Sequence, residues 1–217
     1  MRRLMIVFAL LCARPALAAA DDAPKTESST PAAQPVISPI FGQLVMFTLP
    51  AGFKTVFEQP SADRYIREAV LNGESVDRWS QMITVTGAKG LATSPQMSAQ
   101  YFAAQIAAGF QKTCPKTFSV KPLGPTSVSG QEAFVAVASC GKVDASPDKH
   151  SETALIVVIK GATDIYTVQW AERTPANAEN LTIDENKWKR RLMKLMPIRV
   201  CAIKPGEKPP YPSCADK

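Results

Sequence analysis

The sequence predicts an α+β fold in which a twisted antiparallel sheet of about seven strands carries two main helices. Three observations predict this fold. Short segments rich in β-branched and aromatic residues follow one another along the chain, separated by turn residues. Two longer segments, 95–112 and 184–196, instead repeat their apolar residues at helical spacing. The 217 residues, 46% of them apolar, suffice for one globular domain with a core of its own.

The amino terminus reads as an export signal. Residues 1–20 begin Met-Arg-Arg, continue with a short apolar stretch and end in alanines, which is the pattern of a Sec-type signal peptide cleaved after Ala18 or Ala20. The apolar stretch is about half of the ~20 residues that span a bilayer, so a retained anchor is disfavoured. A twin-arginine signal and a lipidated Cys12 are weaker alternatives, because neither has the neighbouring residues that such signals require.

The folded domain is expected to follow a linker. Residues 21–40 contain four prolines and few residues able to build a core, which predicts a disordered segment. A single domain is then predicted over 41–203. Its first two strands, 44–49 and 53–58, are separated by Pro-Ala-Gly, and we expect them to form a hairpin.

The remaining strands follow from the same patterns. They are predicted at 65–71, 79–86, 118–121, 132–140, 152–160 and 164–172, with an edge strand at 198–203. Turns are expected at 121–125 and at Gly161. Because residues 154–159 are continuously apolar, their strand should be central and covered on both faces.

The helix at 95–112 is expected to use Ser94 as its N-cap and Pro95 as its first residue. Phe102, Ile106 and Phe110 recur every four residues and should face the sheet. The outer face has no charged residue. It is either an ordinary surface of alanine and glutamine, which we favour, or a contact surface for a partner.

The second helix, 184–196, buries a stripe made by Trp188, Leu192 and Leu195. Its basic side chains share one face and are Lys187, Arg190, Arg191 and Lys194. This face could meet an anionic membrane surface. We favour a solvated face whose cations are stabilised near the carboxyl end of the helix.

Charge and cysteines narrow the class of protein. Without the three arginines of the signal, 22 basic residues stand against 19 acidic ones, too small an excess to indicate nucleic-acid binding.

Once Cys12 is removed with the signal peptide, four cysteines remain, and in an exported chain they should form disulfides. They are Cys114, Cys140, Cys201 and Cys214. Three pairings are open. We favour Cys114 with Cys140, and Cys201 with Cys214, because the latter restrains the Pro-rich tail 204–217.

The sequence contains no recognisable catalytic set. It has one histidine, His150, in a polar loop, and no cysteine motif, so we expect neither a metal nor a cofactor. Phosphate-loop, dinucleotide-binding and nucleophile-elbow motifs are missing from the sequence. His150 is interpreted as a solvated loop residue. A pair of carboxylates, Glu68 and Glu74, leaves open a hydrolase that uses acid–base chemistry.

Several spaced features resemble a family of small exported bacterial proteins without an assigned activity. The features are the runs 47–53, 67–68, 73–74, 79–85 and 159–169, together with Arg173 and the four cysteines. The order of elements also resembles, more faintly, the PsbP-like α/β sandwich of the photosystem extrinsic proteins. That resemblance implies an antiparallel sheet between helices and a role in binding or assembly. It carries over no catalytic residue.

These observations favour a monomeric, non-enzymatic module of the periplasm that binds an unknown protein or small molecule. The alternatives are an envelope hydrolase and a secreted host-interaction factor. Candidate binding residues are Glu68, Glu74 and Trp79, which are close in sequence, and Arg173, at a strand end. Trp79 has a second interpretation as a core residue, which we favour.

Overall fold

The computed structural model describes residues 32–143 and 149–215, so the predicted signal peptide and the first part of the predicted linker lie outside the described residues. Two antiparallel sheets make up the fold. The larger has seven strands in the order β3 (Phe53–Pro60), β4 (Arg64–Leu71), β5 (Gln81–Ala88), β9 (Ile165–Pro175), β8 (His150–Lys160), β7 (Gln131–Cys140) and β6 (Phe118–Val128). The smaller has the order β1 (Gln34–Ile40), β2 (Gln43–Leu49) and β10 (Arg199–Ala202).

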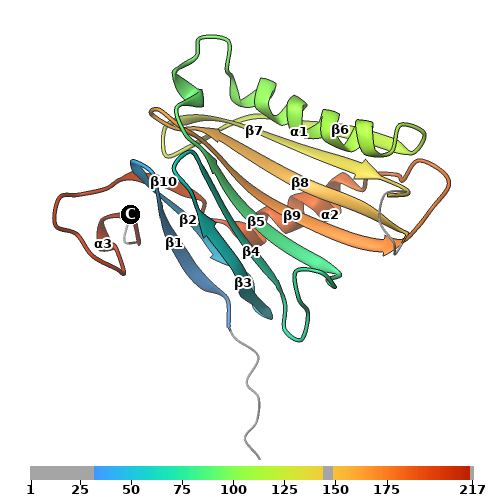
Figure 1. Cartoon of the computed structure of the whole chain (residues 1–217), viewed down its shortest axis with the longest axis horizontal. Helices are drawn as coiled ribbons and strands as arrows, with labels where there is room; N and C mark the ends of the chain where they lie inside the picture. The colour runs from blue at the N-terminus through green and yellow to red at the C-terminus, as the bar shows by residue number, and fades with distance from the viewer. Residues whose placement is uncertain (1–31, 144–148, 216–217) are drawn as a thin grey trace, which may run out of the picture.

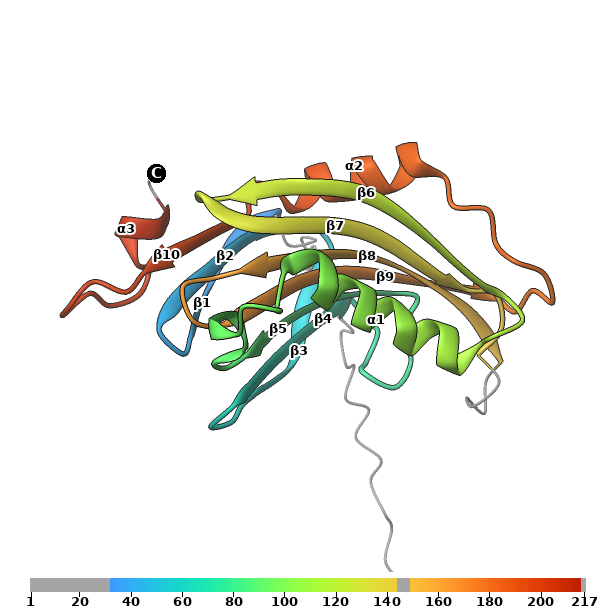
Figure 2. The same ribbon diagram turned by 90° about the horizontal axis from the view of Figure 1, so that it is seen from above.

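The two main helices lie on opposite faces of the large sheet. Helix α1 (Ala99–Thr113) packs on β6, β7 and β8. Helix α2 (Glu185–Leu195) covers the other face, with the small sheet beside it (Figures 1 and 2). Because α1 covers only three strands, the same face of β4, β5 and β9 is left outside its footprint.

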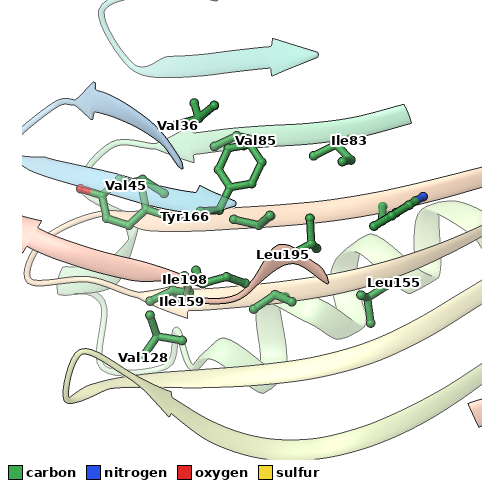
Figure 3. Packing of buried hydrophobic residues seen from close by; sticks show 14 of the residues in the cluster. Val36, Val45, Ile83, Val85, Val128, Leu155, Ile159, Tyr166, Leu195 and Ile198 are labelled. Atoms are coloured by element: carbon green, nitrogen blue, oxygen red, sulfur yellow. The ribbon is translucent and has the colours of Figure 1, made fainter. Parts of the chain in front are cut away.

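Strand β8 is central, as the sequence predicts. Leu155, Val157 and Ile159 point into the core shared with α2 and the small sheet, some of which is shown in Figure 3. Ile156 and Val158, which alternate with them, pack in the second core beneath α1. All these side chains are at most 1% exposed, since both faces of the strand are covered. The predicted α+β class, with an antiparallel sheet and two main helices, is confirmed.

The predicted hairpin between 44–49 and 53–58 is wrong. Strand β2 pairs with β1 and β10 in the small sheet, whereas β3 pairs with β4 in the large one. The Pro-Ala-Gly turn, in which Gly52 has φ 87°, thus carries the chain from one sheet to the other. A buried strand satisfies its backbone groups with whichever neighbours the tertiary structure provides, and nearness in sequence does not fix the partner.

Two predictions based on proline residues are wrong, and both concern edge strands. Residues 34–40, assigned to the disordered linker, form β1, which pairs with β2 in register Gln34↔Leu49 to Ile40↔Gln43. The turn expected at 121–125 lies inside β6, which has an irregular register between Pro122 and Gly124. Both strands are at the edge of their sheets, where proline is tolerated because one side needs no ladder hydrogen bonds.

Helix α1 begins later than expected. A 3₁₀ turn, η1 (Leu91–Thr93), precedes it, and the N-cap is Ser98, whose Oγ accepts a hydrogen bond from the Tyr101 amide. Its buried stripe is alanine, at positions 99, 103 and 107. The predicted residues Phe102, Ile106 and Phe110 are only partly buried beside that stripe. Small side chains let the helix lie close to the sheet and turn the larger ones to its flank.

The second helix agrees with its predicted stripe. Trp188 and Leu195 are 2% and 0% exposed, and Leu192 packs against the same core. The chain then leaves through Pro197 into β10. No described helix is long and apolar enough to cross a membrane.

Both predicted disulfides are present, Cys114 with Cys140 and Cys201 with Cys214. The second joins β10 to the short helix α3 (Pro212–Ala215) and so holds the tail against the small sheet. The Arg199 guanidinium donates to the carbonyls of Cys214 and Ala215, at 2.9 and 2.8 Å. Two disulfides are typical of a protein in an oxidising, extracytoplasmic compartment.

Candidate functional site

A cleft of about 760 Å³ opens where the loop between β4 and β5 meets the ends of β8 and β9. We call it the Arg173 cleft. Its lining residues are Gly73, Glu74, Ser75, Asp77, Arg78, Trp79, Ser80, His150 and Arg173. Three of the four candidate binding residues therefore share one cleft, although about a hundred residues separate Glu74 and Trp79 from Arg173.

Pairing between β5 and β9 brings these residues together. The Arg173 amide donates to the Ser80 carbonyl at 2.8 Å, which continues the β5–β9 ladder past the end of β5. The Arg173 side chain then lies over Trp79, with the guanidinium carbon 3.6 Å from the ring centre. Such a contact combines cation–π attraction with flat stacking. Trp79 is only partly buried and is not one of the buried core residues, so its favoured interpretation as core is wrong.

Glu152 fixes the same guanidinium from the side. Its Oε2 accepts a hydrogen bond from Arg173 Nε at 3.3 Å, and Nε2 of His150 lies 3.6 Å from that oxygen. The three side chains are only 13–27% exposed. His150 is the first residue of β8, so its interpretation as a solvated loop residue is wrong. The one indication of this placement in the sequence was the strand predicted to begin two residues later, at Glu152.

Glu74 organises the loop. Its two carboxylate oxygens accept hydrogen bonds from the Ser80 amide, at 3.0 Å, and the Ser80 hydroxyl, at 2.5 Å. This closes the 74–80 loop on itself and fixes Ser80, the residue after Trp79. Glu74 therefore shapes the cleft, while its own oxygens are already occupied.

The groups left to meet a ligand are mainly donors. Among residues 32–143 and 149–215, neither terminal nitrogen of Arg173 hydrogen bonds to the protein, and the Arg78 side chain has no polar partner either. Asp77 adds one exposed carboxylate. A guanidinium held through Nε and through its flat face presents its terminal N–H groups as a rigid fork, which matches the two oxygens of a carboxylate.

Glu68, the fourth candidate, is elsewhere. It lies in the middle of β4, paired across the sheet with Phe57 and Thr84, and does not line the Arg173 cleft. Burial raises the pKa of its carboxyl. Since Glu68 and Glu74 do not share the cleft, the carboxylate pair that a hydrolase would need is not assembled there.

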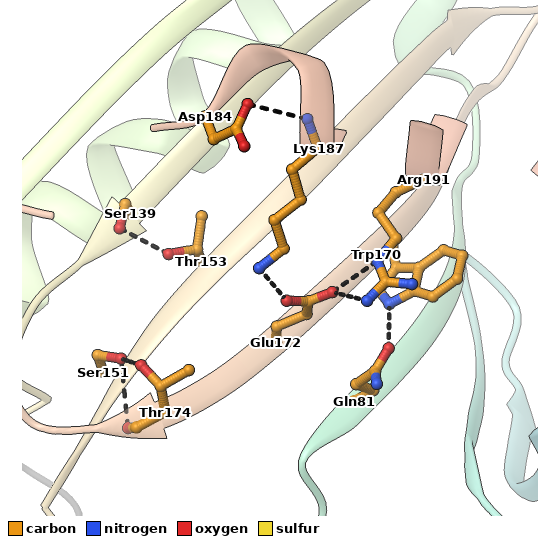
Figure 4. A network of polar contacts seen from close by, with 10 residues as sticks. All are labelled: Gln81, Ser139, Ser151, Thr153, Trp170, Glu172, Thr174, Asp184, Lys187 and Arg191. Atoms are coloured by element: carbon orange, nitrogen blue, oxygen red, sulfur yellow. Dashed lines mark hydrogen bonds and ion pairs between the residues drawn. The ribbon is translucent and has the colours of Figure 1, made fainter. Parts of the chain in front are cut away.

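The predicted basic face of α2 is divided. Lys187 and Arg191 both contact Glu172 of β9, at 2.5 and 2.6 Å, and Arg191 lies 4.5 Å from the ring centre of Trp170 (Figure 4). Glu172 is 8% exposed, so this cluster fixes α2 on the sheet. Arg190 and Lys194 remain exposed. Two cations, rather than four, therefore point to the solvent.

Metal-ligating side chains do not gather in the described part of the chain: no three of its His, Cys, Asp and Glu residues are placed to hold one ion. The residues of the Arg173 cleft are instead a mixture of guanidinium, imidazole, carboxylate and indole. That mixture can bind and orient a polar ligand by hydrogen bonds and stacking.

Comparison with known proteins gives a structural likeness alone. No protein-family model and no curated protein sequence matches the chain. Among solved structures, the chain is similar to the solution structure of cyanobacterial PsbP (CyanoP) from Synechocystis sp. PCC 6803. The TM-score is 0.41 and the identity 9%, over 75% of this chain and 86% of that chain. At this level the likeness bears no functional conclusion.

Proposed function

We propose that the protein, after removal of its signal peptide, is a binding module of the bacterial periplasm whose Arg173 cleft binds the anionic group of a small ligand. One observation carries the proposal: Arg173 is held by Glu152 and Trp79 while its terminal nitrogens meet no protein acceptor in the described residues. Fixing a side chain before binding lowers the entropy that binding must overcome. The compartment follows from the export signal and is supported by the two disulfides.

The charges of the cleft are compatible with an anion. Of the acidic side chains near Arg173, Glu74 is bonded to Ser80 and Glu152 to Arg173 itself, while Asp77 is an exposed carboxylate of the same cleft. Arg78 adds a second guanidinium at the rim. The site is open to solvent, so binding should weaken as salt increases.

The test is calorimetric titration of the mature protein, residues 21–217, with succinate and hexanoate, and with hexanamide as a neutral probe of similar shape. We expect the two carboxylates to bind and hexanamide not to bind. Arg173→Gln should weaken carboxylate binding about tenfold to a hundredfold, the usual value of a charge-assisted bidentate pair. Arg173→Lys keeps the charge but loses the two parallel N–H donors. Its carboxylate affinity should lie between those of the wild type and Arg173→Gln.

The matched control is Arg64→Gln, which removes an arginine that is 86% exposed and begins β4, at the opposite end of that strand from the loop that lines the cleft. It should leave carboxylate affinity unchanged. Carboxylate binding that survives Arg173→Gln, or hexanamide that binds as tightly as hexanoate, would overturn the proposed function.

A further inference from the structure

A second cavity, of about 330 Å³, borders the same arginine. We call it the helix pocket. It lies between the last turns of α1 and the ends of β7 and β8, and its main lining residues are Ile106, Gly109, Phe110, Thr113, Val143 and Glu152. Glu152 lines this pocket, while its partner Arg173, 3.3 Å away, lines the Arg173 cleft. The ion pair therefore borders both cavities.

One of the helix positions that line the pocket lacks a side chain. Residues 106, 109, 110 and 113 are spaced as one stripe of α1, at i, i+3, i+4 and i+7. Gly109 is in the middle of that stripe, and a Cβ added there would meet no atom within 4 Å. Glycine is unfavourable inside a helix, and its backbone freedom is not needed here, so what it provides at this position is space beside the pocket that a larger side chain would occupy.

The pocket is apolar. Ile106, Phe110 and Val143 supply hydrocarbon and aromatic surface. The Thr113 hydroxyl is occupied, because it donates to the Gly109 carbonyl at 2.9 Å. Glu152, the one acidic group, is bonded to Arg173. A volume near the lower end of the ~300–1,000 Å³ typical of ligand pockets suits a short hydrocarbon group.

We propose that the ligand is an amphiphilic carboxylate, whose carboxylate binds the terminal nitrogens of Arg173 and whose unbranched acyl chain occupies the helix pocket. This inference rests on the proposed function of the Arg173 cleft and specifies its ligand class. An anionic head needs a fixed donor fork, and an acyl chain needs an apolar cavity beside it. The Glu152–Arg173 pair borders both cavities.

The test is a titration of the mature protein with the straight-chain carboxylates from butanoate to dodecanoate, each below its critical micelle concentration. Affinity should rise about fourfold for each added methylene until the pocket is full, because the transfer free energy of one buried methylene corresponds to a change of that size in the binding constant. Gly109→Leu should fill the pocket and abolish this dependence on chain length. Gly109→Ala is the matched control and should lose little of the chain-length effect.

Thr113→Phe provides a second variant, since Thr113 is exposed at the rim and its replacement does not disturb the core. It should reduce the affinity of the long carboxylates alone. Butanoate binding that depends on Arg173, with no gain from longer chains, would overturn this inference and leave the proposed function intact. No binding of any carboxylate would overturn both. Long-chain carboxylates that bind the Gly109→Leu and Thr113→Phe variants as tightly as they bind the wild type would also contradict the assignment of the pocket.

Discussion

Glu172 and Arg173 are neighbours in β9 that serve opposite faces of the large sheet. Glu172 binds Lys187 and Arg191 of α2, whereas Arg173 turns the other way and lies over Trp79 in the Arg173 cleft. The alternation of side chains along a strand makes this separation possible. One position thus anchors a helix, and the next places a positive charge in the Arg173 cleft.

Glu172→Gln should destabilise the fold without affecting the cleft. The change leaves two cations of α2 without their shared carboxylate, one of them stacked on Trp170. Because the cations are partly exposed, we expect a loss of ~1–3 kcal/mol in the free energy of unfolding, measured by urea denaturation. Hexanoate affinity should not change. Glu179→Gln, at an exposed glutamate, is the control, and an equal loss there would refute the specific role of Glu172.

Glu185 should contribute to acid sensitivity. Hydrogen bonds from Lys189 and Lys121, with their charges, lower the pKa of Glu185 from 4.5 to about 2. A carboxyl whose pKa is lower in the folded protein stabilises the fold above its ordinary pKa, and this contribution is lost as the pH falls from 4.5 towards 2. Glu185→Gln should therefore show a smaller fall in stability across that range than the wild type. Parallel thermal melts at successive pH values provide the measurement; identical slopes for both proteins would contradict it.

Glu68→Gln should stabilise the protein at neutral pH. Burial raises the pKa of Glu68, so the folded state binds its proton more tightly than the unfolded state. The ionised carboxylate is then unfavourable above the raised pKa, and the penalty disappears as the pH falls below the ordinary value of 4.5. We expect the Tm of the variant to be ~1–2 °C above that of the wild type at pH 7, as for a small change in the stability of a partly exposed site. At pH 3 the two Tm values should be equal. A lower Tm at pH 7 would mean that Glu68 has a stabilising partner.

Removing the tail disulfide should loosen the carboxyl terminus selectively. The Cys201–Cys214 link closes a loop with a sequence separation of 13, for which the chain-entropy model gives ~3 kcal/mol. The double variant Cys201→Ser, Cys214→Ser should expose the tail to proteases before the rest of the domain. Mapping of unreduced peptides from the wild type should recover this link and Cys114–Cys140. A Cys114–Cys201 peptide would show that the pairing is wrong.

Gly141→Ala should be destabilising for a steric reason. A Cβ at this position would lie 2.4 Å from the Glu179 carbonyl and 2.9 Å from that of Asn177. Backbone atoms cannot turn away as side chains do, so we expect a loss of ~1–3 kcal/mol. Gly109→Ala, which meets open space inside a helix, should instead stabilise by ~0.5–1 kcal/mol. Chemical denaturation of the two variants side by side checks the difference in sign.

The sequence alone determined much of the local structure. The strand segments, the stripe of Trp188 and Leu195 on α2 and the covered strand at 154–159 are visible in residue patterns. These features depend on the period of apolar side chains and on nearby capping or turn residues, which are local properties. The sequence also indicated that four cysteines form disulfides, but it left three pairings open, and the structure shows which one forms. Where proline interrupted the pattern, at β1 and β6, local reasoning failed, because tolerance of proline depends on a strand being at an edge.

The tertiary structure alone decided the site. Trp79, His150 and Arg173 are far apart in sequence, and none has a neighbour that indicates the others. They meet because β5 pairs with β9 and β9 with β8 in one register, in which Arg173 lies beside Ser80 and opposite Glu152. A shift of one residue would turn Arg173 to the α2 face and Glu172 into the cleft. That register is fixed by packing of the whole sheet between its helices, so it cannot be predicted from any single segment of the chain.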